Sequence, residues 1–463
     1  MLNRRRLLFS GAAIAAVTAA SVPFAFPGNS PAGEEVIAWL KANAVPLATT
    51  EPGSGFQDIE FLRPIIDQAR IVSIGETTHG TREFFQIRHR LIEYCVSQLG
   101  FSMIGLEAMY GEEQALNDYV LNGKGSAANA IAGMIFWQWQ NEEMIAIVEW
   151  VRAWNLANER KVKFYGFDMQ KTKPASDRLL DYLKRLAPDL AAAIEKPLAP
   201  NVVDAFATLS RPAQDKIIAQ IKHVLDRFDA ERMTWTARSS ELEWRLARQC
   251  AVIMEQLTRR EQLTRRANSL ARSSLRDQCM ADNVSALLEA EGPQTKALLL
   301  AHNEHVQRAP VSWFSPMGTF SSMGNFLHAR FGAKQAVIGF SFNQGCFRAV
   351  GTIDNDTALH EWVVGAAPAH FVDAALARTG LPLFALNLKA VPQNGSVAQW
   401  MASKPWQRAI GISFSHGTVN APPRRNIWLK PYVKSGDPRD RYDVLVFVES
   451  TTATHYIPRR AKV

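Results

Sequence analysis

Cysteine is scarce in this chain, and several motifs that often identify an enzyme are missing from it. Four cysteines are scattered along 463 residues without any Cys-x-x-Cys spacing, so the sequence predicts no disulfide framework. There is no G-x-S-x-G string, the nearest match being Gly339–Gly345, which disfavours acyl-enzyme chemistry with a catalytic serine. G-x-G-x-x-G and Walker A strings are missing too, so nothing supports nucleotide binding.

Long hydrophobic runs are also missing beyond the N-terminal segment, and no later run could span a bilayer. Residues 1–27 combine three arginines, Arg4–Arg6, with a short Ala-rich apolar run and small residues. This order is typical of a secretory signal peptide of the twin-arginine type. We therefore expect cleavage between Ala20 and Pro27, a periplasmic or secreted mature protein, and no stable membrane anchor after the signal is removed.

The charge balance gives little reason to expect a polyanionic partner. The formal net charge is +8, and the predicted signal carries three arginines and no acids, which leaves 8 − 3 = +5 on the mature chain. Basic clusters such as Leu257–Arg266 have no recognition motif beside them and are interpreted as solvated faces. We expect a monomer that binds a small molecule and no nucleic acid.

Short, continuous apolar runs separated by helical patterns predict an α/β protein with a mostly parallel central sheet flanked by helices. The predicted strands are Arg70–Gly75, Phe101–Glu107, Lys163–Asp168, Lys296–His302, Gln335–Phe342 and Tyr442–Ser450. Residues 175–290 are rich in Leu, Ala, Arg and Glu at helical spacing, which predicts a large helical insertion. We expect sheet and insertion to form a single catalytic domain, 28–463.

Ionisable side chains stand where four of the predicted strands end. In chain order they are Glu76 and His79, then Glu107, then Asp168, then His302 and His305. Ligands of open α/β sheets bind outside the carboxyl ends of the strands. If these strands are parallel neighbours, the acids and imidazoles converge on one rim, and the loop Gly75–Gly80 is one wall of a site.

The segment after this loop predicts a helix with an apolar, core-facing stripe. The stripe consists of Phe84, Ile87, Leu91 and Cys95, and Gly100 ends the helix. Arg88 falls within the stripe, whereas Arg82, His89 and Arg90 point away from it. A guanidinium on a core-facing stripe needs a carboxylate partner, and the candidates are Glu76, Glu107 and Asp168.

Two chemistries remain open for these residues. Imidazole titrates near neutral pH, so His79 is a candidate general base. His302 and His305 are three residues apart and could share a helical face, so together with Glu76 or Glu107 they could hold zinc, although the chain has no His-Glu-x-x-His motif. We expect substrate to contact Asp168 and an aromatic wall that includes Trp137 and Trp139.

Five strings in order give the chain a resemblance to the erythromycin esterase family from about Val36 to Tyr456. They are Ile74–Ala108, Tyr165–Gln170, Arg276–Asn283, Leu298–Val306 and Met323–Leu327. The resemblance implies that His79 is the base that activates a water and that Glu76, Arg88 and Glu107 are its acidic and basic partners. His302 and His305 are similar to the family's His-Asn-x-His histidines, and Arg276 and Asp277 to an Arg-Asp pair that braces the site.

By this resemblance we expect hydrolysis of an ester or macrolactone bond, as in macrolide resistance, without a catalytic serine and without an obligatory metal or other cofactor. The export signal is a departure from the cytoplasmic resistance esterases of the family. Two alternatives stay open: a zinc-dependent hydrolase that uses the same His/Glu cluster, and a non-catalytic envelope protein linked to polysaccharide production.

Overall fold

The computed structural model describes residues 30–457, apart from 264–268, 313–317, 354–355 and 416–431. The predicted signal peptide, residues 1–27, therefore lies outside the described residues. Within the described ranges, no helix has both the length and the apolar character needed to cross a membrane.

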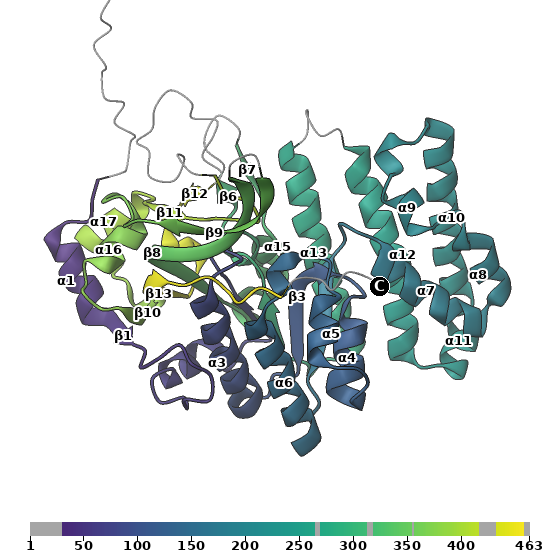
Figure 1. The fold of residues 1–463 in the computed structure, drawn as a ribbon, viewed down its shortest axis with the longest axis horizontal. Coiled ribbons are helices and arrows are strands. Elements are labelled where there is room, and N and C mark those ends of the chain that lie inside the picture. The colour runs from purple at the N-terminus through teal and green to yellow at the C-terminus, as the bar shows by residue number, and fades with distance from the viewer. Residues whose placement is uncertain (1–29, 264–268, 313–317, 354–355, 416–431, 458–463) are drawn as a thin grey trace, which may run out of the picture.

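A central sheet runs through the molecule, and most of its strands are parallel (Figure 1). Its order is β1 (Ala44–Pro46), β10 (Leu383–Asn387), β13 (Val444–Thr451), β8 (Gln335–Ile353), β2 (Ile71–Ile74), β5 (Ala297–Leu300), β3 (Met103–Met109) and β4 (Lys163–Asp168), with β9 (Asp356–Val364) paired to β8. The six strands from β13 to β4 pair in parallel. This confirms the predicted fold class.

The sheet extends beyond the predicted strands in two places. β10 pairs antiparallel with β13, and β1 pairs antiparallel with β10, which adds an antiparallel edge. β8 continues well past the predicted end at Phe342, because its second half pairs antiparallel with β9. Among the described residues, two small two-stranded sheets lie outside it: β6 (Val311–Ser312) with β7 (Thr319–Phe320), and β11 (Trp406–Arg408) with β12 (Val433–Ser435).

Apolar side chains cover both faces of the sheet, which explains the continuous apolar runs. On β2, Val72 and Ile74 belong to one core cluster, and Ile71 belongs to another. The same alternation on β5 assigns Leu298 to the first cluster and Leu299 to the second. Successive strand residues point to opposite faces, so the site at the strand ends stands on a sheet that is buried on both sides.

Helices flank the sheet and form the insertion. The first set is α1 (Glu34–Asn43), α2 (Arg63–Ile66), α3 (Arg82–Leu99), α4 (Glu113–Asn122), α5 (Ala127–Ala132) and α6 (Glu142–Ala157). The insertion holds α7 (Lys173–Leu186), α8 (Pro188–Glu195), α9 (Pro200–Val203), α10 (Arg211–Ala230), α11 (Arg232–Arg238), α12 (Glu241–Gln262) and α13 (Ser269–Glu291). The last set is α14 (Asn303–Val306), α15 (Met323–Phe331), α16 (Val372–Ala377), α17 (Ser396–Ala402) and α18 (Pro438–Arg441).

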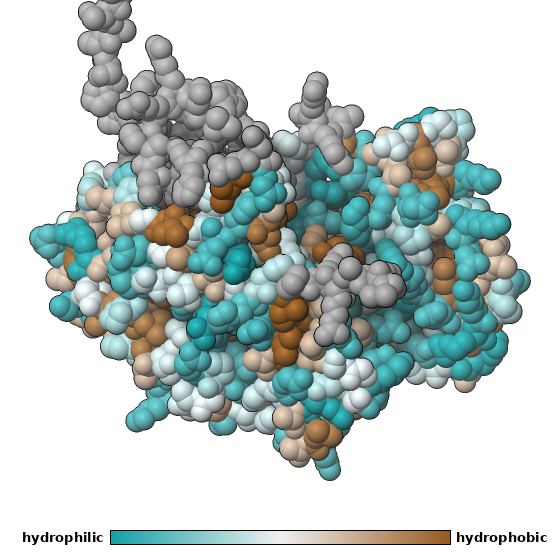
Figure 2. All heavy atoms as spheres, viewed as in Figure 1, coloured by the Kyte–Doolittle hydropathy of each residue, from teal (hydrophilic) through white to brown (hydrophobic). Residues whose placement is uncertain are grey.

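The insertion stands at one end of the molecule, and its last helix, α13, is the one on the side of the sheet (Figure 1). Its helices are amphipathic and bury aromatic residues against one another: Phe228 lies 4.9 Å from Trp235 and 5.6 Å from Tyr182 between ring centroids. The face of the molecule in Figure 2 is largely hydrophilic, with hydrophobic residues in small, separate patches.

Helix α3 is more buried than its single apolar stripe predicts. Cys95 and the rest of the stripe are buried, but so are His89 and Arg90, which point away from it. The cause is the segment before α2, which packs over that face: Arg90 donates to Asp58 Oδ1 at 2.6 Å and to the Thr49 carbonyl at 2.6 Å. The charge of the buried Arg90 is thus balanced by the Asp58 carboxylate.

Candidate functional site

The carboxyl ends of four adjacent strands, β2, β5, β3 and β4, hold the predicted site residues. His79 Nδ1 lies 2.7 Å from Glu76 Oε1, and the rings of His79 and His302 are 5.1 Å apart between centroids. The backbone N–H of His302 donates to Glu107 Oε2 at 3.0 Å. The structure therefore brings together, at one rim of the sheet, residues that are separated by up to 226 positions in the sequence.

Two glycines allow the loop between β2 and α3 to fit against its neighbours. A Cβ on Gly75 would collide with the Asn303 side chain, and a Cβ on Gly80 would collide with the backbone of Arg348. The loop therefore passes too close to other chain segments for any side chain at these positions. Close backbone approach fixes Glu76 and His79 between two anchored glycines.

Arg88, Glu76 and His79 form a linear chain of charge-assisted contacts. Arg88 is fully buried, its Nη1 lies 2.5 Å from Glu76 Oε2, and its other nitrogens donate to the carbonyls of Ile74, Gly75 and Ala301. The other oxygen of Glu76 accepts the Nδ1–H of His79, which fixes the orientation of the ring. The Nε2 atom of His79 is then left as a proton acceptor.

His302 offers a hydrogen-bond donor, whereas His79 offers an acceptor. It caps α14, and its Nδ1 accepts the backbone N–H of Glu304 at 3.3 Å. Burial, followed by repulsion from His79, lowers the pKa of His302 to about 4, so the ring is neutral at pH 7 and carries its proton on Nε2. That buried Nε2 has no hydrogen-bond partner among the described residues, which leaves an oriented donor next to His79.

A second set of charges lies behind these two histidines. His305 Nδ1 is 2.8 Å from Asp277 Oδ1, and its Nε2 is 3.2 Å from Glu107 Oε1. Burial alone lowers the pKa of His305, but the carboxylates of Asp277 and Glu107 outweigh it and raise the pKa to about 10. Burial raises the pKa of Glu107, but His305 and Arg276 lower it well below its usual range. Glu107 is therefore a carboxylate, and His305 Nε2 lies between that carboxylate and Arg276 Nη1, which is 3.0 Å away.

Asp168 lies in this second set and not at a substrate surface. It is fully buried, and Arg276 Nη2 lies 2.6 Å from Asp168 Oδ2 and 2.8 Å from Glu107 Oε1. Its oxygens already accept hydrogen bonds from Arg276, Met169 and Gln170. We therefore assign Asp168 the role of holding Arg276 in position, whereas the sequence led us to expect a contact with substrate.

The two tryptophans differ in placement. Trp137 is half-buried, its ring lies 6.5 Å from the His79 ring in an edge-on arrangement, and its indole N–H has no partner within the described part of the chain. Trp139 is buried, packs against Phe85, and donates its indole N–H to the Glu107 carbonyl at 3.1 Å. Only Trp137 is placed as part of an aromatic wall beside His79; Trp139 is a core residue that holds β3.

The donor geometry offers no metal centre in the part of the chain that the structure describes. No group of three or more His, Cys, Asp or Glu side chains is arranged there to hold a metal ion. His305 directs both ring nitrogens at carboxylates, and His302 uses Nδ1 as a helix cap. All four cysteines are free thiols, and burial raises the pKa of Cys95, Cys250 and Cys279.

One positioning residue, Asn303, was missed in the sequence. Its backbone N–H donates to the Glu76 carbonyl at 2.8 Å, and its side chain bonds both the N–H and the carbonyl of Phe340 on β8. It therefore ties the loop after β2 to the end of β5 and to β8. The sequence feature that could have identified it is its position between His302 and His305. A side-chain amide there can bond both a backbone N–H and a backbone carbonyl.

The fold and this cluster define an α/β protein with a histidine–carboxylate site at the carboxyl ends of its parallel strands. A family model described as erythromycin esterase matches residues 96–451. The chain belongs to the erythromycin esterase family and is a hydrolase of that family. The matched range contains Glu107, Arg276, His302 and His305, whereas Glu76, His79 and Arg88 precede it.

Known proteins resemble the chain at low sequence identity. Erythromycin esterase type II of Escherichia coli is 24% identical over 297 residues, which cover 59% of this chain and 69% of that protein. The crystal structure of a Bacillus cereus protein superposes with a TM-score of 0.78 at 21% identity, covering 91% of this chain and 98% of that one. A mutant of the erythromycin esterase EreC in its open conformation gives a TM-score of 0.66 at 19% identity, over 90% and 99% of the two chains.

Proposed function

We propose that this hydrolase cleaves a carboxylic ester or lactone by a water that His79 activates. The observation that carries the proposal is the contact chain from Arg88 through Glu76 to His79 Nδ1, in a ring 5.1 Å from that of His302, whose buried Nε2 has no hydrogen-bond partner among the described residues. A base oriented by a buried carboxylate, next to a donor for an oxyanion, is what water attack on an acyl carbon requires.

In the first step His79 Nε2 takes a proton from water while the water oxygen bonds to the acyl carbon. The electron pair of the carbonyl moves to its oxygen, and the Nε2–H of His302 donates to the oxyanion. The Glu76 carboxylate, held by Arg88, stabilises the His79 imidazolium that forms.

In the second step the tetrahedral intermediate collapses and the bond to the leaving oxygen breaks. The leaving alkoxide takes the proton from the His79 imidazolium, which restores the base and releases a carboxylic acid and an alcohol. In a lactone both groups stay on one molecule, and the ring is opened.

The second set of charges keeps the two histidines in different roles. Glu107 accepts the backbone N–H of His302, and Arg276 and His305 keep Glu107 ionised. Burial keeps His302 neutral, and its ring donates from a fixed Nε2–H. Glu107, His305, Arg276 and Asp277 thus position the reacting groups without contacting substrate.

The test is turnover of an ester and lactone panel, which includes a macrolide because relatives carry the name erythromycin esterase. The chain from residue 28 onward is assayed with and without a chelator, next to its His79→Ala variant. The proposal predicts hydrolysis that survives chelation and depends on His79. Activity that is lost with the chelator and restored by zinc would instead favour the zinc-dependent hydrolase. A protein that turns over none of the substrates would favour the non-catalytic envelope protein.

A further inference from the structure

A cavity of about 510 Å³ lies where the helical insertion meets the strand ends. α12 and α13 supply part of its wall, including Arg260, Glu261 and Arg272. The segment 204–208 of the insertion and the loops that contain Phe136 and Gln170 supply the rest. The insertion and the sheet thus build this cavity together.

Asp168 and helix α13 connect the cavity wall to the catalytic cluster. Gln170 donates to Asp168 Oδ2 at 2.9 Å, and the same oxygen accepts from Arg276. Arg272 precedes Arg276 by four residues on α13, so both project from one face of the helix. Phe136 of the cavity wall also directly precedes Trp137, whose ring lies 6.5 Å from that of His79, so the cavity wall continues into the wall beside His79.

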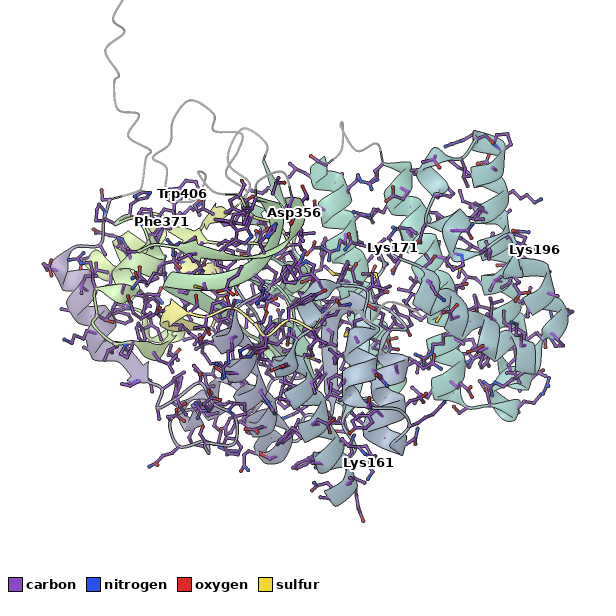
Figure 3. All side chains as sticks on the ribbon, viewed as in Figure 1. Lys161, Lys171, Lys196, Asp356, Phe371 and Trp406 are labelled. Carbon is purple, nitrogen blue, oxygen red and sulfur yellow. The ribbon has the colours of Figure 1, made fainter. Side chains whose placement is uncertain are left out.

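The described lining carries more positive than negative charge. It holds three cations, Lys171, Arg260 and Arg272, and two carboxylates, Asp204 and Glu261. Lys171 Nζ is 3.6 Å from Asp204, which also accepts two hydrogen bonds from Thr172. Figure 3 shows Lys171 at the junction of the sheet with the insertion.

Of the three cations in the lining, Arg260 has the charge that is least well balanced by a carboxylate. Glu261 Oε1 accepts from Arg260 at 3.1 Å and from Arg272 at 2.7 Å, so one carboxylate oxygen serves two guanidinium groups. The buried Nε of Arg260 has no hydrogen-bond partner among the described residues. Burial, and then repulsion from Arg272, lower the pKa of Arg260. A bound anion would give the Arg260 Nε–H a hydrogen-bond acceptor and would offset the repulsion between Arg260 and Arg272.

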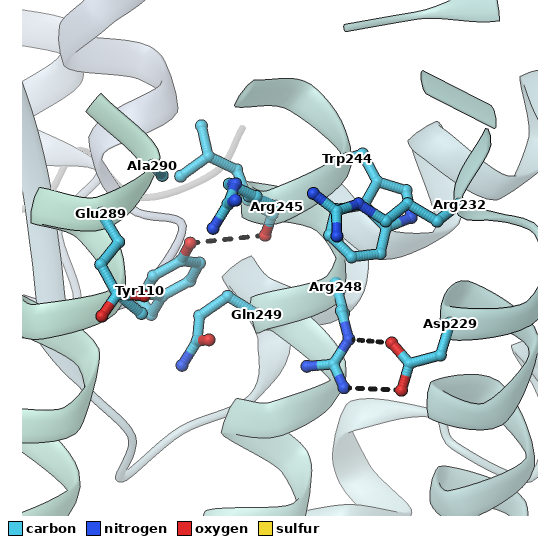
Figure 4. Close-up of a pocket in the computed structure, with 11 residues that line it drawn as sticks. Tyr110, Asp229, Arg232, Trp244, Arg245, Arg248, Gln249, Glu289 and Ala290 are labelled. Atoms are coloured by element: carbon cyan, nitrogen blue, oxygen red, sulfur yellow. Dashed lines mark hydrogen bonds and ion pairs between the residues drawn. The ribbon is translucent and has the colours of Figure 1, made fainter. Parts of the chain in front are cut away.

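A second cavity shows that arginine-lined cavities in this protein are not all alike. It measures about 330 Å³ and lies within the insertion (Figure 4). Arg248 donates twice to Asp229, Arg232 and Arg245 contact Glu241, and Glu289 adds a further carboxylate to the lining. Its lining has the same balance, three arginines and two carboxylates, and Glu241 Oε1 likewise accepts from two arginines. It differs in that none of its arginines has a buried nitrogen without a partner among the described residues.

We propose that the larger cavity binds a carboxylate carried by the ester substrate, and that Arg260 is the residue that selects it. The proposal rests on the proposed ester hydrolysis and adds the substrate class: an ester with an anionic group remote from the scissile bond. A guanidinium with an unused N–H recognises a carboxylate by charge and by directed hydrogen bonds. A neutral ester of the same length leaves the excess charge uncompensated and binds less well.

The test compares mono-para-nitrophenyl glutarate with para-nitrophenyl valerate, two esters of equal acyl length that differ in the remote carboxylate. The wild type is measured beside Arg260→Gln and beside Arg259→Gln, which makes the same charge change at the exposed neighbouring residue. A lost charged hydrogen bond corresponds to roughly tenfold or more in affinity. Arg260→Gln should therefore raise KM for the glutarate ester about tenfold, leave the valerate ester unchanged, and differ from Arg259→Gln.

Binding of free glutarate, measured by calorimetry, separates this proposal from the proposed hydrolysis. If no ester turns over but glutarate binds the wild type and Arg259→Gln and not Arg260→Gln, the anion site stands and the ester chemistry fails. Equal effects of Arg260→Gln and Arg259→Gln on glutarate binding would overturn the site. The net positive charge of this region would then explain any preference for the glutarate ester. Glutarate that does not bind, together with no preference between the two esters, would overturn it as well.

Discussion

Replacing Arg88 by methionine should destabilise the protein strongly, because it leaves a buried carboxylate without its cation. Arg88 is fully buried and the Glu76 side chain is 2% exposed. Breaking a buried ion pair from one side costs about 3–5 kcal/mol. The carbonyls of Ile74, Gly75 and Ala301 lose their donor as well, so the free energy of unfolding should fall by at least that amount.

Equilibrium unfolding in urea measures this loss, and two companion variants show its cause. Arg82→Met, on the same helix but 38% exposed in its side chain, should change stability by no more than about 0.5 kcal/mol. Adding Glu76→Gln to Arg88→Met should recover part of the loss, since no charge is then stranded. A destabilisation below about 1 kcal/mol for Arg88→Met would refute the reasoning that this pair supports the loop.

Two more predictions concern the other histidines. The pKa of His305 is raised to about 10 from an ordinary value of about 6.5. Its contribution to stability should therefore be complete below about pH 6.5 and should fall by about 1.4 kcal/mol per pH unit up to about pH 10. Urea titrations of the wild type and His305→Asn should differ in slope within that window, and parallel curves would contradict the ion pairs. His302→Asn keeps a helix-capping side chain but removes the Nε2–H donor, so kcat should fall roughly 10²–10³-fold with little change in KM; an unchanged kcat would mean that another group binds the oxyanion.

Much of the sheet could be predicted because its strands are buried on both faces. β5 is a continuous apolar run and β2 is interrupted only by the buried Ser73, and such runs in an α/β protein belong to parallel strands. Once the strands are parallel neighbours, the acids and imidazoles that follow them must lie at one rim. The proximity of Glu76, His79, Glu107 and His302 followed from that geometry.

The pairing of charges within the rim could not be predicted in the same way. Glu76, Glu107 and Asp168 all remained candidate partners of Arg88, because strand order decides which of them it reaches. Asp168 was expected to contact substrate, but Arg276 arrives from α13, 108 positions later, and pairs with it. No local pattern around Asp168 carries information about that helix.

The same limit applies to the aromatic residues. Trp137 and Trp139 are two residues apart, yet one faces His79 and the other packs in the core. The difference arises from the short 3₁₀ turn Trp137–Trp139, whose direction depends on contacts with β3 and α3. Asn303 was missed for a related reason, since its partners lie on β8, in a later part of the chain.

The most direct test of the mechanism is the activity of His79→Ala with and without added imidazole. Removal of a positioned base should lower kcat/KM by roughly 10²-fold or more, while urea unfolding stays close to that of the wild type. Free imidazole should restore part of the activity after the rate without enzyme is subtracted, because the cavity that replaces the ring lies between Glu76 and the reacting water. A folded His79→Ala protein that hydrolyses ester nearly as fast as the wild type would contradict the assignment of His79 as the base.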